Sequence, residues 1–426
     1  MLIALILFLF LITLLVGMPV AFAMGITSLL YILLSGEFSY FLNIPQRMYI
    51  ATDNFTLLAI PFFMLVGEIM NSGGITRRLI NYFQLLLGHF HGSLSYVNIG
   101  TSGFLASIIG SSNAVAAITS SSIVPEMKKN GFSGEYSAGV SAASSVLGPI
   151  IPPSIIMIIY AITAGTSVGD LFLAGIIPGL LMVGAFCVIA FIYARKNNFP
   201  KGTKSDFKTI LQHSWVPLPA LFIPLGIVGG IVSGLLTATE AGVIGCLIAF
   251  IIGKFIYKEI KWSQIPNMFF RAGMTTAAIL LIAATANLFG WVLTIEQVPQ
   301  LIASALLNLT TEPLLILLII NIFLLILGMF LEPFAAILIV VPVFLPIIST
   351  LGIDPVHFGL MICLNLSIGM ITPPMGLSVF IVSGVTKIPV DKVFRSTTPY
   401  LMASIVVLLI ITYIPQISLF LPNLLK

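Results

Sequence analysis

The sequence predicts an all-α polytopic membrane protein of two related halves, each containing a re-entrant helical hairpin and a broken helix. Composition is the first indication: 59% of the 426 residues are hydrophobic and 8% are charged, with a mean hydropathy of +1.16. A soluble domain carries about 25% charged residues, so this chain has too little polar surface for water. The second indication is a pair of interrupted apolar runs, and the third is a constant offset between the halves.

The two apolar runs cover 103–153 and 324–374, and each contains two interruptions. Inside a bilayer, backbone that leaves the helix must be buried in protein or line a cavity. Paired interruptions in two halves are typical of transporter binding sites. The interruptions, which combine glycine, proline and short polar residues, are Gly110–Asn113, Gly148–Pro153, Gly328 with Glu332–Pro333, and Gly369–Pro374.

One offset of 221 residues leads from five prolines and two glycines of the first half to the same residue types in the second. These residues mark backbone breaks rather than bulk hydrophobicity, so we predict an internal duplication. The predicted halves are 1–200 and 222–426, joined by a cytoplasmic linker at 201–221. An odd number of crossings per half would invert one copy relative to the other, and we expect this inverted arrangement. The matching pairs are Pro45 and Pro266, Pro125 and Pro346, Gly131 and Gly352, Gly148 and Gly369, Pro152 and Pro373, Pro153 and Pro374, and Pro178 and Pro399.

The first element is an apolar run that extends to about Leu34 and lacks a basic start, so we expect it to be retained rather than cleaved. A span needs about 20 residues, so the run is either one long tilted helix or two helices hinged at Gly17–Pro19. An amphipathic connection follows at Gly36–Asn54. We expect about ten to twelve spans in all, besides the two hairpins. Later spans are predicted at Phe55–Met70, Leu79–Gly88, Leu171–Tyr193, Val216–Leu236, Glu240–Tyr257, Met268–Trp291 and Leu314–Leu331.

The segment Arg195–Gln212 is the most strongly charged loop, and by the positive-inside rule it is predicted to be cytoplasmic. Its cations outnumber its one acid, Asp206. They are Arg195, Lys196, Lys201, Lys204 and Lys208.

The first hairpin tip offers oxygen ligands without net charge, and a hard cation such as Na⁺ prefers oxygen ligands. Ser111 and Asn113 supply side-chain oxygens at the first hairpin tip. The prolines of Gly148–Pro153 lack N–H donors and therefore free carbonyl groups. Gly328, Gly369 and Thr372 take similar places in the second half. The alternative is that these small residues only let helices pack closely.

Helix N-termini at the hairpin tips carry partial positive charge, which suits a carboxylate. Ser112, Ser144 and Ser145 add hydroxyl groups, which either bind the substrate or simply permit close helix packing. Glu332 lies at the second tip and is a functional candidate, because charge inside a membrane is costly. Glu240 is interpreted as a residue that starts a helix.

No motif in the sequence indicates an enzyme. The sequence contains no HExxH, no P-loop and no glycine-rich dinucleotide motif. We expect no Ser–His pair inside the membrane, so intramembrane proteolysis is disfavoured. Cys187, Cys246 and Cys363 lie in apolar runs without metal-binding spacing. No long basic stripe indicates nucleic-acid binding.

Several motifs resemble the large membrane subunit of TRAP (tripartite ATP-independent periplasmic) transporters, and the likeness covers essentially the whole chain. The motifs are IPFFMLVGEIMNSGGITRRL at 60–79, GSSNAVAAITSSSIVPEM at 110–127, SAASSVLGPIIPPSIIM at 141–157, GMFLEPFAAILIVVPVFLPI at 328–347 and NLSIGMITPPMG at 365–376.

This resemblance implies an elevator-type transporter of the bacterial inner membrane that takes up an organic acid, such as a C4-dicarboxylate or sialic acid, together with Na⁺. Scaffold helices would lie in 1–75 and 222–292. A transport domain would contain the hairpins and broken helices of 96–164 and 314–386. The implied partners are a small four-helix membrane subunit on a separate chain and a periplasmic binding protein; no cofactor beyond the coupling ion is expected.

The resemblance also implies two sodium sites, each between a hairpin and the following broken helix. The two break motifs differ in sequence, so the sites need not be equivalent. One site maps to Ser111, Asn113, Gly148, Ile151 and Pro153, and the other to Gly328, Gly369, Thr372 and Pro374. The predicted substrate-binding residues are Ser112, Ser144, Ser145 and Glu332.

Two other functions fit parts of the pattern. A stand-alone ion-coupled carboxylate antiporter or exporter would have the same inverted plan, but it would not need a soluble binding protein. A channel would need a continuous pore, whereas duplicated broken helices favour alternating access.

Overall fold

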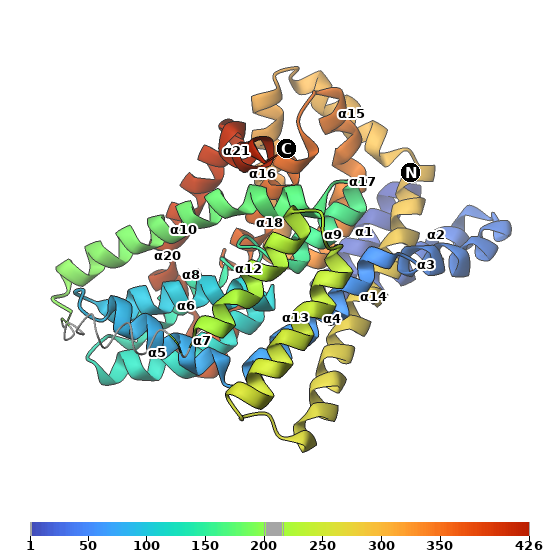
Figure 1. Cartoon of the computed structure of the whole chain (residues 1–426). Coiled ribbons are helices and arrows are strands. Elements are labelled where there is room, and N and C mark those ends of the chain that lie inside the picture. The colour runs from blue at the N-terminus through green and yellow to red at the C-terminus, as the bar shows by residue number, and fades with distance from the viewer. Residues whose placement is uncertain (1, 200, 202–214, 216, 426) are drawn as a thin grey trace.

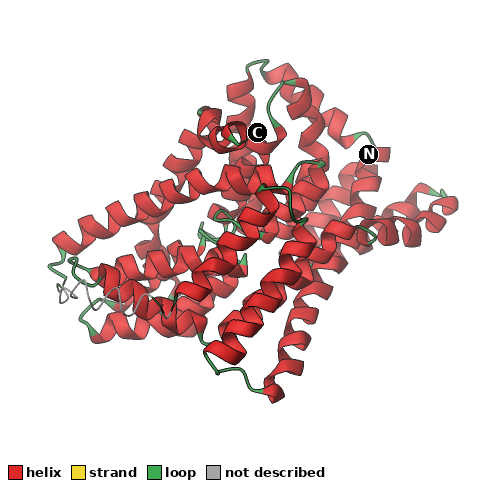
Figure 2. Ribbon diagram, viewed as in Figure 1, coloured by secondary structure: helices red, strands yellow, loops and turns green. Residues whose placement is uncertain are grey.

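The computed structural model describes residues 2–199, 201, 215 and 217–425, and the regular structure of these residues is helical (Figure 2). One isolated bridge pairs His91 with Lys201. The all-α prediction is therefore confirmed. Of the predicted linker 201–221, residues 202–214 and 216, including Lys204 and Lys208, lie outside the described part of the chain.

The first half contains ten α-helices among the described residues. They are α1 (Leu2–Leu15), α2 (Val20–Ser35), α3 (Asn43–Thr52), α4 (Ala59–Ser72), α5 (Ile75–Leu87), α6 (Ser93–Ile109), α7 (Ser112–Lys129), α8 (Gly134–Ser145), α9 (Ile155–Ala164) and α10 (Val168–Lys196).

The second half also contributes ten described α-helices. They are α12 (Leu218–Val232), α13 (Ala238–Ile251), α14 (Ile265–Ile295), α15 (Val298–Leu309), α16 (Pro313–Phe330), α17 (Pro333–Thr350), α18 (Pro355–Gly369), α19 (Leu377–Thr386), α20 (Val390–Tyr413) and α21 (Pro415–Leu424).

Seven helices in the described chain are long and apolar enough to cross a membrane, fewer than the predicted ten to twelve. The N-terminal run is divided at Gly17–Pro19 into α1 and α2, which are both shorter than a full span. The predicted span at Leu79–Gly88 is wrong. This segment belongs to α5, a 13-residue helix whose polar face carries Arg77 and Arg78. Its leucines suggested a span, but the helix is too short and too amphipathic to be one.

The bounds of the helices follow the offset found in the sequence. Helix α7 covers Ser112–Lys129 and α17 covers Pro333–Thr350, so both bounds differ by 221 (333 − 112 and 350 − 129). Helices α8 and α18 start at Gly134 and Pro355, which again differ by 221 (355 − 134). These helices therefore start and end at equivalent places in both halves.

The helices pack in two groups. In the first group, α4 lies beside α13 and α14, and α14 also packs on α2 and α3 (Figure 1). In the second group, α6, α7, α8 and α10 associate with α18, α19 and α20. Packing between the groups runs mainly through α4 with α6, α10 with α12, and α14 with α17.

The first group is held together at a corner where α4 turns into α5. Arg78 donates to Glu259 at 2.6 Å and to the Gly74 carbonyl at 3.1 Å, and its guanidinium lies 4.1 Å from the ring centroid of Tyr257. Arg77 pairs with the same Glu259 oxygen at 2.9 Å. These contacts fix the position from which α5 leads to the second group.

Helix α13 begins with a capping box, which confirms the interpretation of Glu240 as a helix-start residue. The Thr237 hydroxyl oxygen accepts from the Glu240 N–H at 3.3 Å, while Glu240 Oε2 accepts from the Thr237 N–H at 2.8 Å. Both bonds satisfy N–H groups that a helix start would otherwise leave unpaired.

Candidate functional site

The first hairpin tip is a two-residue break between α6 and α7. Gly110 has φ +61°, a left-handed conformation that ends α6, and Ser111 caps α7 by accepting from the Ala114 N–H at 3.5 Å. The broken helix touches this tip from behind. A Cβ built on Gly148 would lie 3.2 Å from the Ser112 nitrogen. A side chain at this position would crowd the first tip, so glycine favours the close approach of the two interruptions.

Each broken helix tightens before it stops. Val146, Leu147 and Gly148 donate to carbonyl groups three residues back, and so do Met370, Ile371 and Thr372. Such i→i−3 bonds characterise a 3₁₀ turn at a helix end. The chain then passes through a cis peptide bond in each half, at Pro152–Pro153 and at Pro373–Pro374. Helices α9 and α19 resume beyond these prolines.

The second tip approaches its broken helix even more closely. A Cβ on Gly369 would lie 2.5 Å from the carbonyl carbon of Gly328. Nearby, the Thr372 hydroxyl donates to the Ile368 carbonyl at 2.8 Å, which leaves its oxygen lone pairs available to a cation. Gly328, Gly369 and Thr372 are therefore brought together, as their predicted roles require.

The two tips also meet each other. Asn113 donates to Glu332 Oε1 at 3.3 Å, and its own side-chain oxygen accepts from the Ser378 hydroxyl at 3.5 Å. The helices behind these residues cross between the halves in the same way: α7 packs on α19, and α17 packs on α9. Asn113 thus joins the first half to two elements of the second half, at sequence separations of 219 and 265 residues.

Two hydroxyl groups at this junction have no hydrogen-bond partner within the described residues. They belong to Ser112, at the start of α7, and Ser144, in the last turn of α8, and both residues are buried. An unpartnered buried polar group costs about 1–3 kcal/mol, so a ligand that bonds with it regains that energy. Ser145 differs, because its hydroxyl donates to the Ala142 carbonyl at 2.7 Å.

Four helices start at this junction and four end there. The starts of α7, α9, α17 and α19 direct partial positive charge toward it, and the ends of α6, α8, α16 and α18 direct carbonyl groups toward it. Helix starts favour an anion and helix ends favour a cation. The arrangement is thus suited to holding both ions side by side.

The remaining predicted residues lie within the breaks. Ile151 packs into α10, since a Cβ on Gly179 would be 2.8 Å from its Cγ1 atom. Pro153 and Pro374 follow the cis bonds. All of the predicted sodium and substrate residues therefore fall on the hairpin tips, the breaks or the helix turn next to them.

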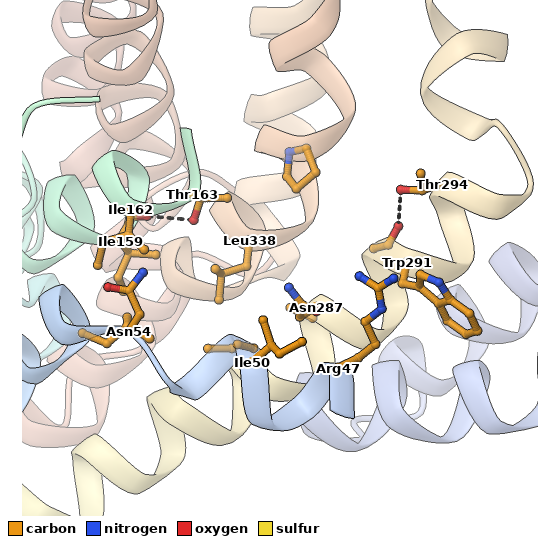
Figure 3. Close-up of a pocket in the computed structure, with 16 residues that line it drawn as sticks. Arg47, Ile50, Asn54, Ile159, Ile162, Thr163, Asn287, Trp291, Thr294 and Leu338 are labelled. Atoms are coloured by element: carbon orange, nitrogen blue, oxygen red, sulfur yellow. Dashed lines mark hydrogen bonds between the residues drawn. The ribbon is translucent and has the colours of Figure 1, made fainter. Parts of the chain in front are cut away.

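A cavity of about 460 Å³ lies between the two helix groups (Figure 3). Arg47 and Asn54 come from α3 and the turn after it, Asn287 and Trp291 come from α14, and Thr163 comes from the second half of α9. The Arg47 guanidinium lies 5.7 Å from the Trp291 ring centroid. Among the described residues that line this cavity, Arg47 carries the only charge.

Sequence reasoning missed this cavity. Its lining comes from four separate segments of the chain, within 47–57, 159–163, 283–294 and 338–342, which no local pattern connects. The one available signal was Arg47, the only cation of the amphipathic segment Gly36–Asn54.

A second cavity, of about 590 Å³, lies along α7 on the side of the Arg77–Glu259 pair. Ser121, Ser122 and Glu126 of α7 face Arg77 across it. This cavity follows α7 away from the tip, toward the end that carries Lys128 and Lys129.

One serine–histidine contact occurs at the start of α18. His357 and Ser418 form a buried pair, with 2.8 Å between Nδ1 and the hydroxyl oxygen. Their separation of 61 residues hid the pair from sequence reasoning. Ser418 also donates to the Pro415 carbonyl at 2.8 Å, and both side chains are almost completely buried. The pair joins α18 to α21 and offers no access to a substrate.

Comparison with a solved structure supports the fold. The crystal structure of the Alcanivorax borkumensis YdaH transporter is similar with a TM-score of 0.62, over 89% of this chain and 89% of that chain. The sequences are only 14% identical, so this likeness concerns the fold alone.

Comparison with curated proteins shows the family. The chain is 40% identical to the C4-dicarboxylate TRAP transporter large permease protein DctM of Pseudomonas aeruginosa, over 94% of each chain. It is 38% identical to the sialic acid TRAP transporter large permease protein SiaM of Vibrio cholerae, over 96% of this chain and 95% of that protein. It is also 38% identical to the isethionate TRAP transporter permease protein DctMQ of Oleidesulfovibrio alaskensis, over 96% of this chain and 64% of that longer protein.

A family model described as "Tripartite ATP-independent periplasmic transporter, DctM component" matches residues 7–417. The resemblance drawn from the motifs is thereby confirmed. Members of this family are multi-pass permeases of the bacterial inner membrane and not enzymes. The chain belongs to the DctM family and is a large permease subunit of a TRAP transporter.

Proposed function

We propose that the protein is a sodium-coupled secondary transporter subunit that imports an organic acid by an elevator mechanism. The observation that carries this proposal is the meeting of the two hairpin tips. Each tip touches a glycine of its own broken helix, and the tips contact each other through Asn113 and Glu332. Ion sites and substrate site would then share one junction, so that binding at one affects the other.

The proposed sodium sites are the two tip-and-break contacts. Ser111, Asn113, Gly148, Ile151 and Pro153 would form the first site. Gly328, Gly369, Thr372 and Pro374 would form the second. Support comes from the helix ends that converge there, whose carbonyl groups are the ligands a hard cation prefers.

The proposed substrate site lies between the tips: Ser112, Ser144 and Ser145 would bind the acid there, and Glu332 borders the same place from the second tip. The unpartnered hydroxyls of Ser112 and Ser144 support it, since a carboxylate accepts two such bonds readily. Helix starts supply the positive potential without a permanent cation. The substrate is proposed to be a C4-dicarboxylate, sialic acid or a related acid, because relatives named for C4-dicarboxylate, sialic acid and isethionate transport share 38–40% identity.

An inverted arrangement of the halves is part of the proposal, and one ion pair supports it. Helix α10 starts at Val168, directly after α9 ends, so it starts at the far end of the broken helix α8–α9. Its counterpart α20 starts at the opposite end of that broken helix, because Lys392 pairs with Glu135 at the beginning of α8 at 2.7 Å. Equivalent helices that start at opposite faces are what inversion requires.

The two packing groups are proposed to move relative to each other. The group of α4, α13 and α14 would be the scaffold, and the group of hairpins and broken helices would slide along it. The cavity beside Arg47 would open to the periplasm. It lies near the end of α9, whereas the basic end of α10, Arg195 and Lys196, marks the cytoplasmic side. The cavity along α7 would then open to the cytoplasm.

Two partners are proposed. One is a small membrane subunit, since the chain matches 64% of the longer DctMQ protein and 67% of the Haemophilus influenzae sialic acid permease SiaT. The other is a periplasmic binding protein that delivers the acid beside Arg47. A positive side chain at that mouth would speed the arrival of an anion.

Uptake into proteoliposomes tests the proposed function. The chain is reconstituted with its small subunit and binding protein, and entry of radiolabelled succinate and N-acetylneuraminate is followed with and without an inward Na⁺ gradient. We expect uptake only with the gradient and only with the binding protein. Uptake without a Na⁺ gradient would contradict the coupling, and uptake without the binding protein would favour a stand-alone carboxylate transporter.

A further inference from the structure

Glu332 holds the cap position of α17, but its carboxylate does not cap the helix. Its counterpart at the same offset is Ser111 (332 − 221), which caps α7 through the Ala114 N–H. Glu332 makes no side-chain bond to the start of α17. Its Oε1 atom instead accepts from Asn113 of the other half. The carboxylate is therefore directed across the junction rather than used for local helix stability.

The contact with Asn113 occurs once and is not a by-product of the repeat. The residue equivalent to Asn113 is Phe334 (113 + 221), which has no amide to offer. The residue equivalent to Ser378 is Met157 (378 − 221), which has no hydroxyl group. The two hydrogen bonds that link Ser378, Asn113 and Glu332 thus have no equivalent at the corresponding positions of the other repeat.

The position between the tips favours one anion at a time. The starts of α7 and α17 favour negative charge between the tips. The same donors, above all the Asn113 amide, are those a substrate carboxylate would use. Two carboxylates sharing these donors would repel each other. The bond from Asn113 to Glu332, at 3.3 Å, and the bond from Ser378 to Asn113, at 3.5 Å, are at the long end of the hydrogen-bond range and are therefore weak.

We propose that Glu332 is an internal substitute for the substrate: its carboxylate occupies the anion position between the tips in the empty carrier and leaves when the substrate binds. The inference rests on the proposed function and specifies how the substrate-free transporter crosses. An importer must return empty to the periplasmic side. Moving a junction of unpaired donors past apolar surroundings is costly, and a carboxylate already bound to those donors lowers that cost.

A comparison of net uptake with exchange tests whether Glu332 acts in the empty carrier or in the loaded carrier. Net uptake requires the empty carrier to return, whereas counterflow exchanges labelled for unlabelled substrate without an empty step. Proteoliposomes carry the chain with its small subunit and the binding protein on both faces, and the probes are radiolabelled succinate and N-acetylneuraminate. The variant is Glu332→Gln, which keeps the shape and removes the charge. Glu332→Asp keeps the charge and serves as the conservative rescue.

For Glu332→Gln, we expect net uptake to fall about tenfold, the effect of losing roughly one well-placed polar interaction, while counterflow stays within about twofold of the wild type. Glu332→Asp should recover most of the net uptake. Glu312→Gln is the matched control. Glu312 holds the N-cap position of α16 in the same hairpin, and its exposed side chain makes no hydrogen bond to the helix start. The net uptake and the counterflow of Glu312→Gln should match those of the wild type.

Equal loss of net uptake and counterflow in Glu332→Gln would overturn the inference, because Glu332 would then act in the loaded carrier. Unchanged net uptake would overturn it as well. A wild-type protein that shows neither Na⁺-driven uptake nor counterflow would contradict the proposed function itself. Counterflow in the variant also demonstrates that the variant is folded.

Discussion

Gly328 and Gly369 lie in direct backbone contact: a Cβ on Gly369 would be 2.5, 2.6 and 2.7 Å from the carbonyl carbon, Cα and oxygen of Gly328. Real Cβ atoms do not approach backbone atoms so closely. The contact joins the second hairpin to the second broken helix, and its geometry excludes every residue other than glycine.

Gly369→Ala should therefore separate the second hairpin from its broken helix. Overpacking of this kind costs about 1–3 kcal/mol, so the unfolding temperature in KCl should fall and Na⁺-driven uptake should be lost. The matched control is Gly384→Ala on α19, where a Cβ would meet nothing within 4 Å. Equal behaviour of the two variants in thermal unfolding and uptake would contradict the importance of the contact.

Ser112→Ala and Ser144→Ala should weaken substrate binding without weakening the fold. Their hydroxyl groups have no partner in the described structure, so their removal breaks no hydrogen bond and should not lower the free energy of unfolding. Loss of a bond to the substrate should raise the KM for uptake about tenfold.

The control for these serines is Ser404→Ala. The Ser404 hydroxyl is buried but donates to the Tyr400 carbonyl at 2.8 Å, away from the junction. Its removal should leave KM unchanged. An unchanged KM in Ser112→Ala and Ser144→Ala would remove both residues from the substrate site.

Arg47→Gln should slow substrate entry. A positive charge at the mouth of the 460 Å³ cavity attracts an anion, and salt screens this attraction. We expect KM to rise about tenfold at low ionic strength, with a smaller difference at high salt. Arg395→Gln, on the exposed surface of α20, should leave KM unchanged at both low and high ionic strength. A salt-independent defect in Arg47→Gln would indicate a structural role instead.

Thr237→Ala should lower stability and spare transport. The substitution removes the capping box of α13, which is worth about 0.5–2 kcal/mol. Thermal unfolding should occur at a lower temperature, while the KM for uptake should match the wild type. Ser233→Ala, in the same exposed turn, removes a hydroxyl that only bonds within its own helix and should have a smaller effect.

Local backbone signals made the breaks predictable. Gly110, Gly148, Gly328 and Gly369 lie within three residues of a helix end, because glycine and the nearby prolines act close to their own position. The same signals give the bounds of α7 and α17. Composition identified the membrane class for a similar reason, since it requires no knowledge of contacts.

Contacts between distant segments were not predictable in this way. The bond between Asn113 and Glu332 depends on how the halves pack, and hydropathy is the same whichever helices become neighbours. The cavity beside Arg47 likewise joins α3, α9 and α14. Helix α5 was misread because its apolar residues suggested a membrane span, although they gather on one face of a helix of only 13 residues.

The direct test of the account is whether both breaks bind Na⁺. Purified protein is unfolded thermally at increasing NaCl, with KCl keeping ionic strength constant. Each occupied site adds about 1.4 kcal/mol of stability when Na⁺ is tenfold above its Kd. We predict that Na⁺ raises the unfolding temperature, that K⁺ does not, and that Gly369→Ala loses about half of the Na⁺-dependent rise in stability. Equal stabilisation by Na⁺ and K⁺, or a full sodium response in Gly369→Ala, would contradict the account.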